Sequence, residues 1–398
     1  MTVRAGRELL SIPGPTNVPD EVLSAMHRPA VDIYTGSLVE VTMSLLDDLR
    51  GLFRTRGRTY IYAANGHGAW EAALTNVLSR GDKILVLESG RFATGWGAMA
   101  TTLGADVEVL PGSYTHAVRP AEVEARLRID TGHEIKAVLV VQIDTASGVV
   151  NDIAGIGRAI RAAGHPALFM VDAVASLACM PFEMDTWGID VAVAGSQKGL
   201  MTPPGLSFVA ASERAVSAHR HANMITPYWD WTFREGEEHY QKYCGTPPEH
   251  LLFGLRKAID MLKAEGLPAV FERHRLLAGA TQAAVAEWSK GGTLDFSILD
   301  PAERAPSVTT VLWNGETSGQ PLKALVDYAR DKCGVVLGTG IGALGGRAFR
   351  IAHMGHVNAP MVLGALAVVE TALSALAVPH GSGGVQAAIA HLARNVKP

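Results

Sequence analysis

The chain has 398 residues, of which 48% are hydrophobic and 19% are charged. Its 35 lysines and arginines and its 39 aspartates and glutamates leave a formal charge of −4. This composition excludes an intrinsically disordered chain, and it argues against nucleic acid as the main partner because phosphate binding needs a basic face.

The sequence carries no sign of export, membrane insertion or metal binding. Cys179, Cys244 and Cys333 form no C-x-x-C pair, so we expect neither a disulfide framework nor a metal site. Residues 1–10 lack the apolar region of a secretory signal. The longest apolar stretch, residues 361–378, is interrupted by a glutamate, which favours a buried helix over a membrane span. We expect a cytoplasmic protein without a membrane partner.

The first two thirds of the chain alternate short apolar strands with helical patterns. Strands are predicted over residues 59–64, 83–88, 136–142, 167–172, 190–194 and 206–211. Helices are predicted over residues 69–78, 94–103 and 152–163, followed by two long ones over residues 251–266 and 269–289. This alternation predicts an α/β fold with a mostly parallel, doubly wound sheet covered on both faces.

The pattern changes near residue 268. Strands are predicted over residues 307–313 and 347–352, and helices over residues 322–333 and 360–377. Shorter elements in this order are typical of an α+β unit. We therefore expect an N-terminal segment over residues 1–16, a large domain over residues 17–268 and a smaller C-terminal domain over residues 269–398.

Two charged residues follow buried strands of the predicted sheet. Asp172 ends the strand over residues 167–172, and Lys198 comes four residues after the strand over residues 190–194. Ligands of doubly wound sheets bind at the carboxyl ends of strands, and a desolvated lysine has a lowered pKa that makes it a usable nucleophile. Pyridoxal 5′-phosphate (PLP) needs a lysine for a Schiff base and a carboxylate that keeps its ring nitrogen protonated. The pair therefore favours a PLP site. The other interpretations are that Asp172 is an ordinary turn aspartate and that Lys198 is an ordinary surface lysine.

A glycine-rich turn and an arginine extend this candidate site. Asn65, Gly66, His67 and Gly68 lie between a predicted strand and a predicted helix, where glycines and free helix N–H groups can hold a phosphate. Tight strand–helix turns also use glycine for their own geometry. Arg350 lies among apolar neighbours, so it is predicted either to bind a carboxylate in a cleft or to form a structural ion pair.

Residues 340–345 spell G-x-G-x-x-G, the pattern of dinucleotide-binding sites. That pattern should open a helix directly after its strand, whereas a second strand is predicted from residue 347. We therefore expect a flexible active-site loop here and no dinucleotide site.

Together these residues resemble a known family. Residues 196–199 (Ser-Gln-Lys-Gly), Asp172 in Val-Asp-Ala-Val, and Arg350 in Phe-Arg-Ile are similar to class V aminotransferases of PLP fold type I, above all to serine–glyoxylate and alanine–glyoxylate aminotransferases. The resemblance runs from residues 13–17 to the last helices and is especially clear over residues 70–76. It implies a transaminase that moves an amino group from serine or alanine to glyoxylate or pyruvate in a ping-pong reaction.

The resemblance also implies roles for single residues around the cofactor. Lys198 would hold PLP as a Schiff base and move a proton at the substrate Cα, and Asp172 would pair with the ring nitrogen. The remaining cofactor contacts would come from Asn65, Gly66, His67, Gly68, Phe92, Thr145, Val174 and Gln197. Within that set, Phe92 and Val174 would pack on the two ring faces.

Further implied roles concern the substrate and a second subunit. Arg350 would bind the substrate carboxylate, and Tyr34 and Pro15 would line the substrate side. Tyr243 and Thr246 would contact the phosphate held by a neighbouring subunit, so the resemblance implies a homodimer with shared active sites.

The chain departs from this group at residues 32–35. The glyoxylate enzymes usually carry Asp-His-Arg-Ser there, whereas this chain has Asp-Ile-Tyr-Thr. Because Tyr34 should face the substrate, the amino donor stays open, and a tyrosine there is similar to pyridoxamine–pyruvate aminotransferases. A desulfurase or lyase is a second alternative, although the loop over residues 338–346 lacks the cysteine that a desulfurase needs. A non-catalytic PLP-binding protein is the third.

Overall fold

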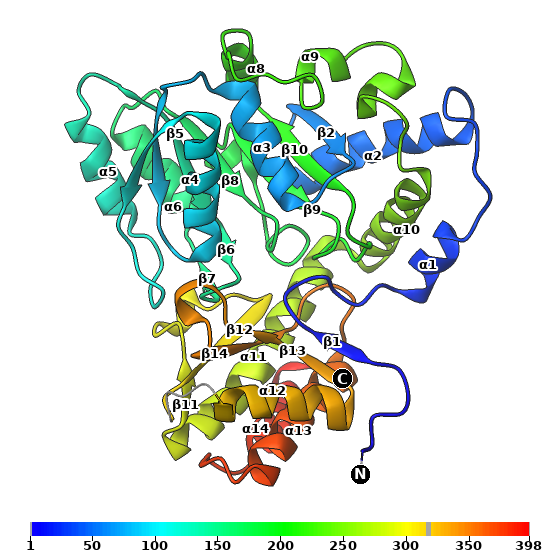
Figure 1. The fold of residues 1–398 in the computed structure, drawn as a ribbon, viewed down its shortest axis with the longest axis vertical. Helices are drawn as coiled ribbons and strands as arrows, with labels where there is room; N and C mark the ends of the chain where they lie inside the picture. The colour runs from blue at the N-terminus through cyan, green and yellow to red at the C-terminus, as the bar shows by residue number, and fades with distance from the viewer. Residues whose placement is uncertain (1, 316–319, 398) are drawn as a thin grey trace.

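The computed structural model describes residues 2–315 and 320–397 and contains two main β-sheets (Figure 1). One sheet has seven strands and the other has five, and each carries its own hydrophobic clusters. The long helices α10 (Glu249–Glu265) and α11 (Leu267–Trp288) connect them, with Gly266 between the two helices at a φ of +83°. This arrangement is the α/β fold with a smaller α+β part that the sequence predicts.

The seven-stranded sheet has the order β2–β10–β9–β8–β5–β3–β4. Its strands are β2 (Arg58–Tyr62), β3 (Lys83–Leu87), β4 (Asp106–Leu110), β5 (Ile135–Val141), β8 (Leu168–Asp172), β9 (Val191–Gly195) and β10 (Ser207–Ala211). The five strands from β9 to β4 run parallel, and β10 runs antiparallel to both of its neighbours. The prediction of a mostly parallel sheet is therefore confirmed. Two short strands, β6 (Ile143–Asp144) and β7 (Val149–Val150), form a ribbon beyond the end of β5.

Helices cover both faces of this sheet, as parallel strands that are apolar on both sides require. One face carries α2 (Ser37–Phe53), α5 (Pro120–Ile129), α6 (Ile153–Ala162) and α10, and the opposite face carries α3 (Gly66–Val77), α4 (Arg91–Leu103) and α8 (Glu213–His219). Shorter helices are α1 (Asp20–Met26), α7 (Met184–Trp187) and α9 (Trp231–Arg234), and η1 (His239–Tyr243) is a 3₁₀ turn.

The five-stranded sheet has the order β1–β13–β14–β12–β11. It consists of β1 (Leu9–Ser11), β11 (Leu294–Phe296), β12 (Val308–Trp313), β13 (Val335–Thr339) and β14 (Ala348–Ala352), packed with α11, α12 (Gln320–Cys333), α13 (Ala359–Ala375) and α14 (Gly384–Asn395). The N-terminal strand β1 pairs in parallel with β13, with Leu9 opposite Val335. The start of the chain is thus part of the C-terminal sheet, which the sequence analysis does not anticipate.

The predicted elements agree with the observed ones to within about three residues at each end. The strands that the analysis leaves out lie at sheet edges or are very short, except β13, which has five residues and lies between β1 and β14. For example, β4 alternates charged and apolar residues at the edge of the large sheet and lacks an apolar run. No helix among residues 2–315 and 320–397 is both long and apolar enough to cross a bilayer, and α13 packs within the C-terminal hydrophobic cluster.

A small hydrophobic cluster joins the parts of the chain built on the two sheets. It contains Ile143 of β6 and Ala175 after β8, both beyond the carboxyl ends of the large sheet, and Val308 and Met354 from the C-terminal part. The carboxyl ends of β5, β8 and β9 therefore face the small sheet, which is where ligands of doubly wound sheets bind.

Candidate active site

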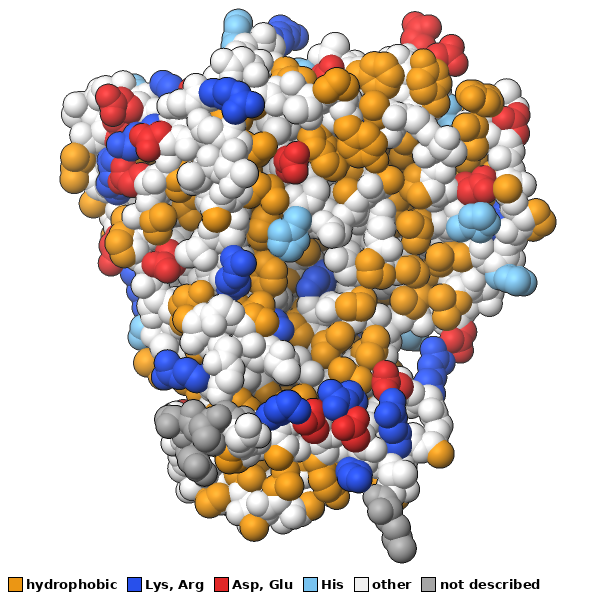
Figure 2. Space-filling model, in the orientation of Figure 1, with side chains coloured by type: hydrophobic (Ala, Val, Ile, Leu, Met, Phe, Trp, Pro, Cys, Tyr) orange, Lys and Arg blue, Asp and Glu red, His pale blue; other side chains and the backbone are white. Residues whose placement is uncertain are grey.

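A cavity of about 260 Å³ lies at the carboxyl ends of β5, β8 and β9. Its lining comprises Asn65, Gly66, His67, Trp70, Phe92, Val141, Ile143, Thr145, Asp172, Val174, Ala175, Gln197 and Lys198. Figure 2 shows lysine or arginine and histidine side chains gathered near the middle of one face, between the parts built on the two sheets. The structure thus brings together most of the residues that the sequence predicts around the cofactor.

Asp172 is the last residue of β8 and is buried. Its carboxylate accepts one hydrogen bond from the Trp70 indole N–H at 2.8 Å and another from the Val174 backbone N–H at 2.7 Å. Burial raises the pKa of Asp172 to about 6 in spite of these two donors. A buried carboxylate held in one orientation is suited to a cationic partner such as a protonated ring nitrogen.

Lys198 follows β9 in a buried turn. Burial lowers the pKa of its amine to about 8, and the positive charge of Arg350 adds to this effect. An amine with this pKa is substantially neutral near pH 8, so Lys198 can act as a nucleophile and as a base. Its Nζ donates a hydrogen bond to the carbonyl oxygen of Pro13.

The N-terminal segment covers this lysine. Gly14 has a φ of +105°, and a Cβ on it would lie 2.5 Å from Lys198 Nζ, so only glycine fits there. Thr16 donates from its backbone N–H to the Gln197 carbonyl at 3.1 Å and from its hydroxyl to the Lys198 carbonyl at 3.2 Å. Pro15, predicted on the substrate side, is exposed within this segment. The segment therefore connects β1 of the small sheet to the turn that carries the lysine.

The N-terminus of α3 forms the glycine-rich turn. Asn65 caps the helix, and its side-chain oxygen accepts from the backbone N–H groups of His67 at 3.1 Å and Gly68 at 3.3 Å. A Cβ on Gly66 would lie 3.1 Å from a Val174 methyl group, so glycine allows this close approach. Burial, followed by the charge of Arg91, lowers the pKa of His67. Asn65 thus occupies the N–H groups of His67 and Gly68, and the N-terminus of α3 still presents the positive end of the helix dipole, which favours a phosphate.

Gln197 gives an independent indication that the cavity takes a polar group. Its side-chain oxygen is buried and has no hydrogen-bond partner among the described residues. Buried polar atoms are rarely left unpaired in native proteins. Together with the Asp172 carboxylate and the helix N-terminus, this atom shows that the residues present fit PLP.

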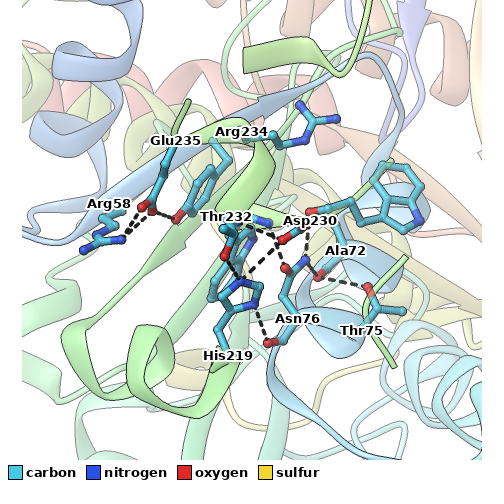
Figure 3. A network of polar contacts seen from close by, with 12 residues as sticks. Arg58, Ala72, Thr75, Asn76, His219, Asp230, Thr232, Arg234 and Glu235 are labelled. Atoms are coloured by element: carbon cyan, nitrogen blue, oxygen red, sulfur yellow. Dashed lines mark hydrogen bonds and ion pairs between the residues drawn. The ribbon is translucent and has the colours of Figure 1, made fainter. Parts of the chain in front are cut away.

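A polar network anchors the other end of α3 (Figure 3). Asn76, near the end of this helix, donates to the Trp229 carbonyl at 2.9 Å and accepts from the Trp231 backbone N–H at 3.0 Å. His219 contacts the Asn76 carbonyl at 3.1 Å and the Thr232 hydroxyl at 2.8 Å. The Trp229 ring in turn lies 3.2 Å from the position a Cβ on Gly68 would take. The network therefore fixes both α3 and an aromatic ring beside the glycine turn.

Arg350 lies on β14 and is buried at the edge of the cavity. Its Nε donates to the Thr339 carbonyl at 2.8 Å and its Nη1 to the Thr145 carbonyl at 3.0 Å. Burial lowers its pKa to about 10, so it stays cationic near neutral pH. Within the described part of the chain it makes no ion pair within 4 Å, and the buried Asp144 carboxylate balances its charge only through a longer-range attraction.

Six predicted residues are not part of the cavity lining, namely Gly68, Pro15 and Arg350, which lie next to lining residues, and Tyr34, Tyr243 and Thr246. Tyr34 is 65% exposed near the start of α2, and Thr246 is exposed after η1. Tyr243 is buried in a different cavity, where its hydroxyl hydrogen-bonds to Thr42 Oγ1 at 2.8 Å. Their roles toward the substrate or a second subunit stay predictions.

Sequence reasoning missed two residues that shape the site. The Trp70 indole donates to the Asp172 carboxylate. The position of Trp70 in the sequence does not indicate that contact. Asp144 is buried and accepts from the backbone N–H groups of Phe92 at 2.8 Å and Ala93 at 3.1 Å, so it fixes the start of α4. A carboxylate just after the apolar strand β5 was the same kind of signal that identified Asp172.

The cysteines and the G-x-G-x-x-G segment do not contribute to the cavity lining. Burial raises the pKa of the Cys179 thiol to about 12, and no described cysteine lines the cavity. The glycine pattern forms a 3₁₀ turn, η4 (Gly342–Leu344), that leads directly into β14 instead of opening a helix. Its Gly342 packs against Arg91 at the start of α4. No group of His, Cys, Asp and Glu suited to a metal ion occurs among the described residues.

Comparisons with known proteins agree with this geometry. The family described as aminotransferase class V matches residues 10–340. A serine–glyoxylate aminotransferase of Methylorubrum extorquens is 39% identical over 99% of this chain and 98% of its own length. An L-aspartate–glyoxylate aminotransferase of Paracoccus denitrificans is 36% identical over 96% and 95% of the two chains. A crystal structure of a pyridoxamine–pyruvate aminotransferase from Mesorhizobium loti has a TM-score of 0.88 and 27% identity, covering 99% of both chains.

Proposed function

The chain belongs to the class V aminotransferases and is a PLP-dependent transaminase of fold type I, and we propose that it transfers an amino group from serine or alanine to glyoxylate or pyruvate. The reaction follows a ping-pong order, in which the keto acid formed from the donor leaves before the acceptor binds. Two of the similar proteins use glyoxylate according to their names, which supports this acceptor.

One observation carries the proposal. Lys198 and Asp172 face the same cavity, and Arg350 lies at its edge without an ion pair in the described chain. PLP, when bound, supplies an electron sink for charge that develops on the substrate carbon. Asp172 would keep a proton on the ring nitrogen, and the positive N-terminal end of α3 would hold the phosphate.

The remaining residues act on the substrate. Arg350 binds its α-carboxylate and so fixes which bond at Cα can be broken. Lys198 Nζ would take the proton from the substrate Cα and hold it for return during the transfer, a task that its pKa of about 8 allows near neutral pH. The Pro13–Gly14 segment covers this amine and limits access of water.

Transfer of labelled nitrogen tests the proposed substrates. Purified enzyme loaded with PLP is incubated with ¹⁵N-serine or ¹⁵N-alanine and glyoxylate, and ¹⁵N-glycine is measured by mass spectrometry. We expect labelled glycine at catalytic rates from at least one donor. Label that stays in both donors after incubation with glyoxylate would contradict transfer from serine or alanine to glyoxylate.

The second candidate function is pyridoxamine–pyruvate transamination. The similar fold of the Mesorhizobium loti enzyme and the tyrosine at position 34 favour it. Pyridoxamine lacks the carboxylate of an amino acid, so the two functions make different demands on Arg350.

The Arg350→Gln variant separates these two functions. Loss of a bidentate, charge-assisted contact should raise the KM for serine or alanine by roughly 30- to 160-fold, since such contacts contribute about 2–3 kcal/mol. Turnover of pyridoxamine with a saturating oxo acid should change much less. The measurement is steady-state KM for each donor in the wild type and the variant. Equal KM values for serine or alanine in both proteins would remove Arg350 from the substrate site.

We also propose that two copies form a homodimer. Large hydrophobic side chains are exposed on and near α1, α2 and α9, namely Leu23, Met43, Tyr228, Phe233 and Tyr240, and Figure 2 shows hydrophobic side chains spread over the upper right of that face. A contiguous apolar patch of this kind marks an interaction surface. Thr246 follows Tyr240 in the chain and is exposed, so a partner placed there would contact it, whereas Tyr243 is buried in the single chain and would have to move to reach a partner. Sedimentation equilibrium of the full chain distinguishes the dimer from the monomer.

A further inference from the structure

The turn that follows β14 is held by two side chains of the connecting helix α11. His274 accepts a hydrogen bond through Nε2 from the Gly355 backbone N–H at 3.0 Å. Arg273 donates from Nη1 to the carbonyls of Gly355 and Val357, both at 3.0 Å. Adjacent residues of one helix therefore bind both the N–H and the C=O of Gly355.

This turn packs directly on the backbone of the catalytic lysine. Gly355 has a φ of +80°, and a Cβ on it would lie 3.1 Å from the Lys198 carbonyl oxygen and 3.1 Å from Thr16 Oγ1. Thr16 itself donates to the same Lys198 carbonyl. The Lys198 backbone is thus enclosed by Thr16 from the N-terminal segment and by Gly355 from the turn.

The chemistry of His274 makes its contact specific. Its side chain is fully buried, and its other ring nitrogen, Nδ1, donates to the Val270 carbonyl at 2.7 Å. That contact leaves Nε2 as the acceptor of a neutral ring. Burial lowers the pKa of His274 to about 4, so the ring keeps this form at neutral pH. A phenylalanine would fill the same space without an acceptor.

We propose that His274 is a positioning residue that fixes Lys198 through the turn at Gly355. The side chain touches neither the cavity nor the lysine amine, so it acts only through the backbone contact between the two turns. Loss of the acceptor frees the Gly355 N–H, loosens the packing on the Lys198 carbonyl and lets the lysine leave its catalytic position. This inference rests on the proposed role of Lys198 as the proton-transferring residue.

The test compares His274→Phe with a matched control, His165→Phe. His165 is also buried and also accepts a backbone N–H, that of Ala167 at 3.2 Å, but it lies beyond α6 in the large domain, away from the cavity. Hydrogen exchange of the full chain, followed by mass spectrometry, reports the backbone of residues 353–357 and residues 196–201. The same proteins loaded with PLP are assayed for kcat and KM and for the pH midpoint of the cofactor absorbance.

His274→Phe should speed hydrogen exchange about tenfold in both segments, as expected for a lost hydrogen bond to a buried N–H. It should also lower kcat about tenfold, change KM less than twofold and shift the pH midpoint of the cofactor absorbance. His274→Gln, which offers an oxygen acceptor, should recover most of kcat. His165→Phe should lower the melting temperature without any of these changes. Asp172, Arg350 and Cys179 also face Lys198 and are the same in all variants, so they do not account for a difference in midpoint.

Faster exchange confined to residues 353–357, with kcat and the midpoint unchanged, would overturn the proposal and leave His274 a structural residue. If His274→Phe does not fold, Arg273→Met removes the other contact to the same turn and should give the same two-segment exchange. Unchanged exchange at residues 196–201 in that variant would also overturn it. If bound PLP gives the same absorbance in the wild type and in Lys198→Ala, the proposed function fails instead. The exchange data then still decide whether the two turns are coupled.

Discussion

Replacing Lys198 by alanine should lower the kcat of transamination by on the order of 10⁴-fold. In the proposed mechanism the amine supplies both the nucleophile that holds the cofactor and the base at the substrate Cα, and positioned proton transfer alone contributes up to about 10⁴-fold. No second described lysine lines the cavity, so nothing in that part of the chain replaces it. The measurement is single-turnover conversion of serine or alanine by Lys198→Ala and wild type at equal PLP loading.

Two controls accompany the Lys198→Ala variant. Lys136 is exposed and donates only to the His133 carbonyl, so Lys136→Ala should keep wild-type turnover. An added small amine such as methylamine should restore part of the lost rate to Lys198→Ala, because it can enter the space that the side chain leaves. A Lys198→Ala protein that turns over within about tenfold of the wild type would contradict the proposed mechanism.

Replacing Asp172 by asparagine should lower kcat by roughly 10³-fold, in the range measured when one preorganised electrostatic contact is removed from an active site. The amide has nearly the same shape but cannot stabilise a proton on the ring nitrogen. It can still accept the Trp70 N–H, so the site should stay folded. The assay is kcat for each donor at saturating PLP, with bound PLP measured separately.

The same variant should be more stable than the wild type when PLP is absent. The pKa of Asp172 is about 6 in the folded chain against an ordinary value of 3.8, so the folded state holds the proton more tightly. Ionisation of Asp172 therefore lowers the free energy of unfolding of the PLP-free wild type. This loss is absent below pH 3.8, grows between pH 3.8 and 6, and is fully present above pH 6, where it amounts to about 3 kcal/mol. Loss of one acceptor for the Val174 N–H offsets about 1–2 kcal/mol of this gain.

Denaturant titrations of the PLP-free proteins at pH 7 and pH 4 test this sign. Asp172→Asn should have the higher free energy of unfolding at pH 7, by about 1–2 kcal/mol, and should lose that advantage at pH 4. In the PLP-loaded protein a protonated ring nitrogen beside Asp172 would lower the pKa of this carboxyl, so the pH-dependent loss of stability applies to the PLP-free protein. The measured quantity is the free energy of unfolding of Asp172→Asn minus that of the wild type. If this difference is smaller at pH 7 than at pH 4, burial does not penalise the charged form of Asp172.

The sequence was informative wherever a charged residue interrupts an apolar pattern. Asp172 and Lys198 stand just after buried strands, and the topology brings those strands side by side, so their proximity could be predicted. Arg350 was recognisable for the same reason, although its lack of an ion pair needed the structure. The alternation of strands and helices likewise predicted the large sheet, because apolar strands of a parallel sheet must be covered on both faces.

Other features depend on contacts between residues far apart in the sequence. Strand β1 has only three residues, and it is a strand only because β13 offers a free edge more than 300 residues later. The hydrogen bond between Trp70 and Asp172 joins residues 102 positions apart, and neither residue type reveals it. His274 likewise looks like an ordinary helix residue until the turn at Gly355 is placed against it.

The most direct test of the proposed transamination is a half-reaction with single substrates. Purified enzyme loaded with PLP is mixed with serine, alanine, other single amino acids or pyridoxamine, and the yellow absorbance of the bound cofactor is followed before and after glyoxylate or pyruvate is added. We expect serine or alanine to bleach the absorbance and the oxo acid to restore it, with Lys198→Ala inert in both steps. An absorbance that no amine bleaches, or that no 2-oxo acid restores, would contradict transamination at this site.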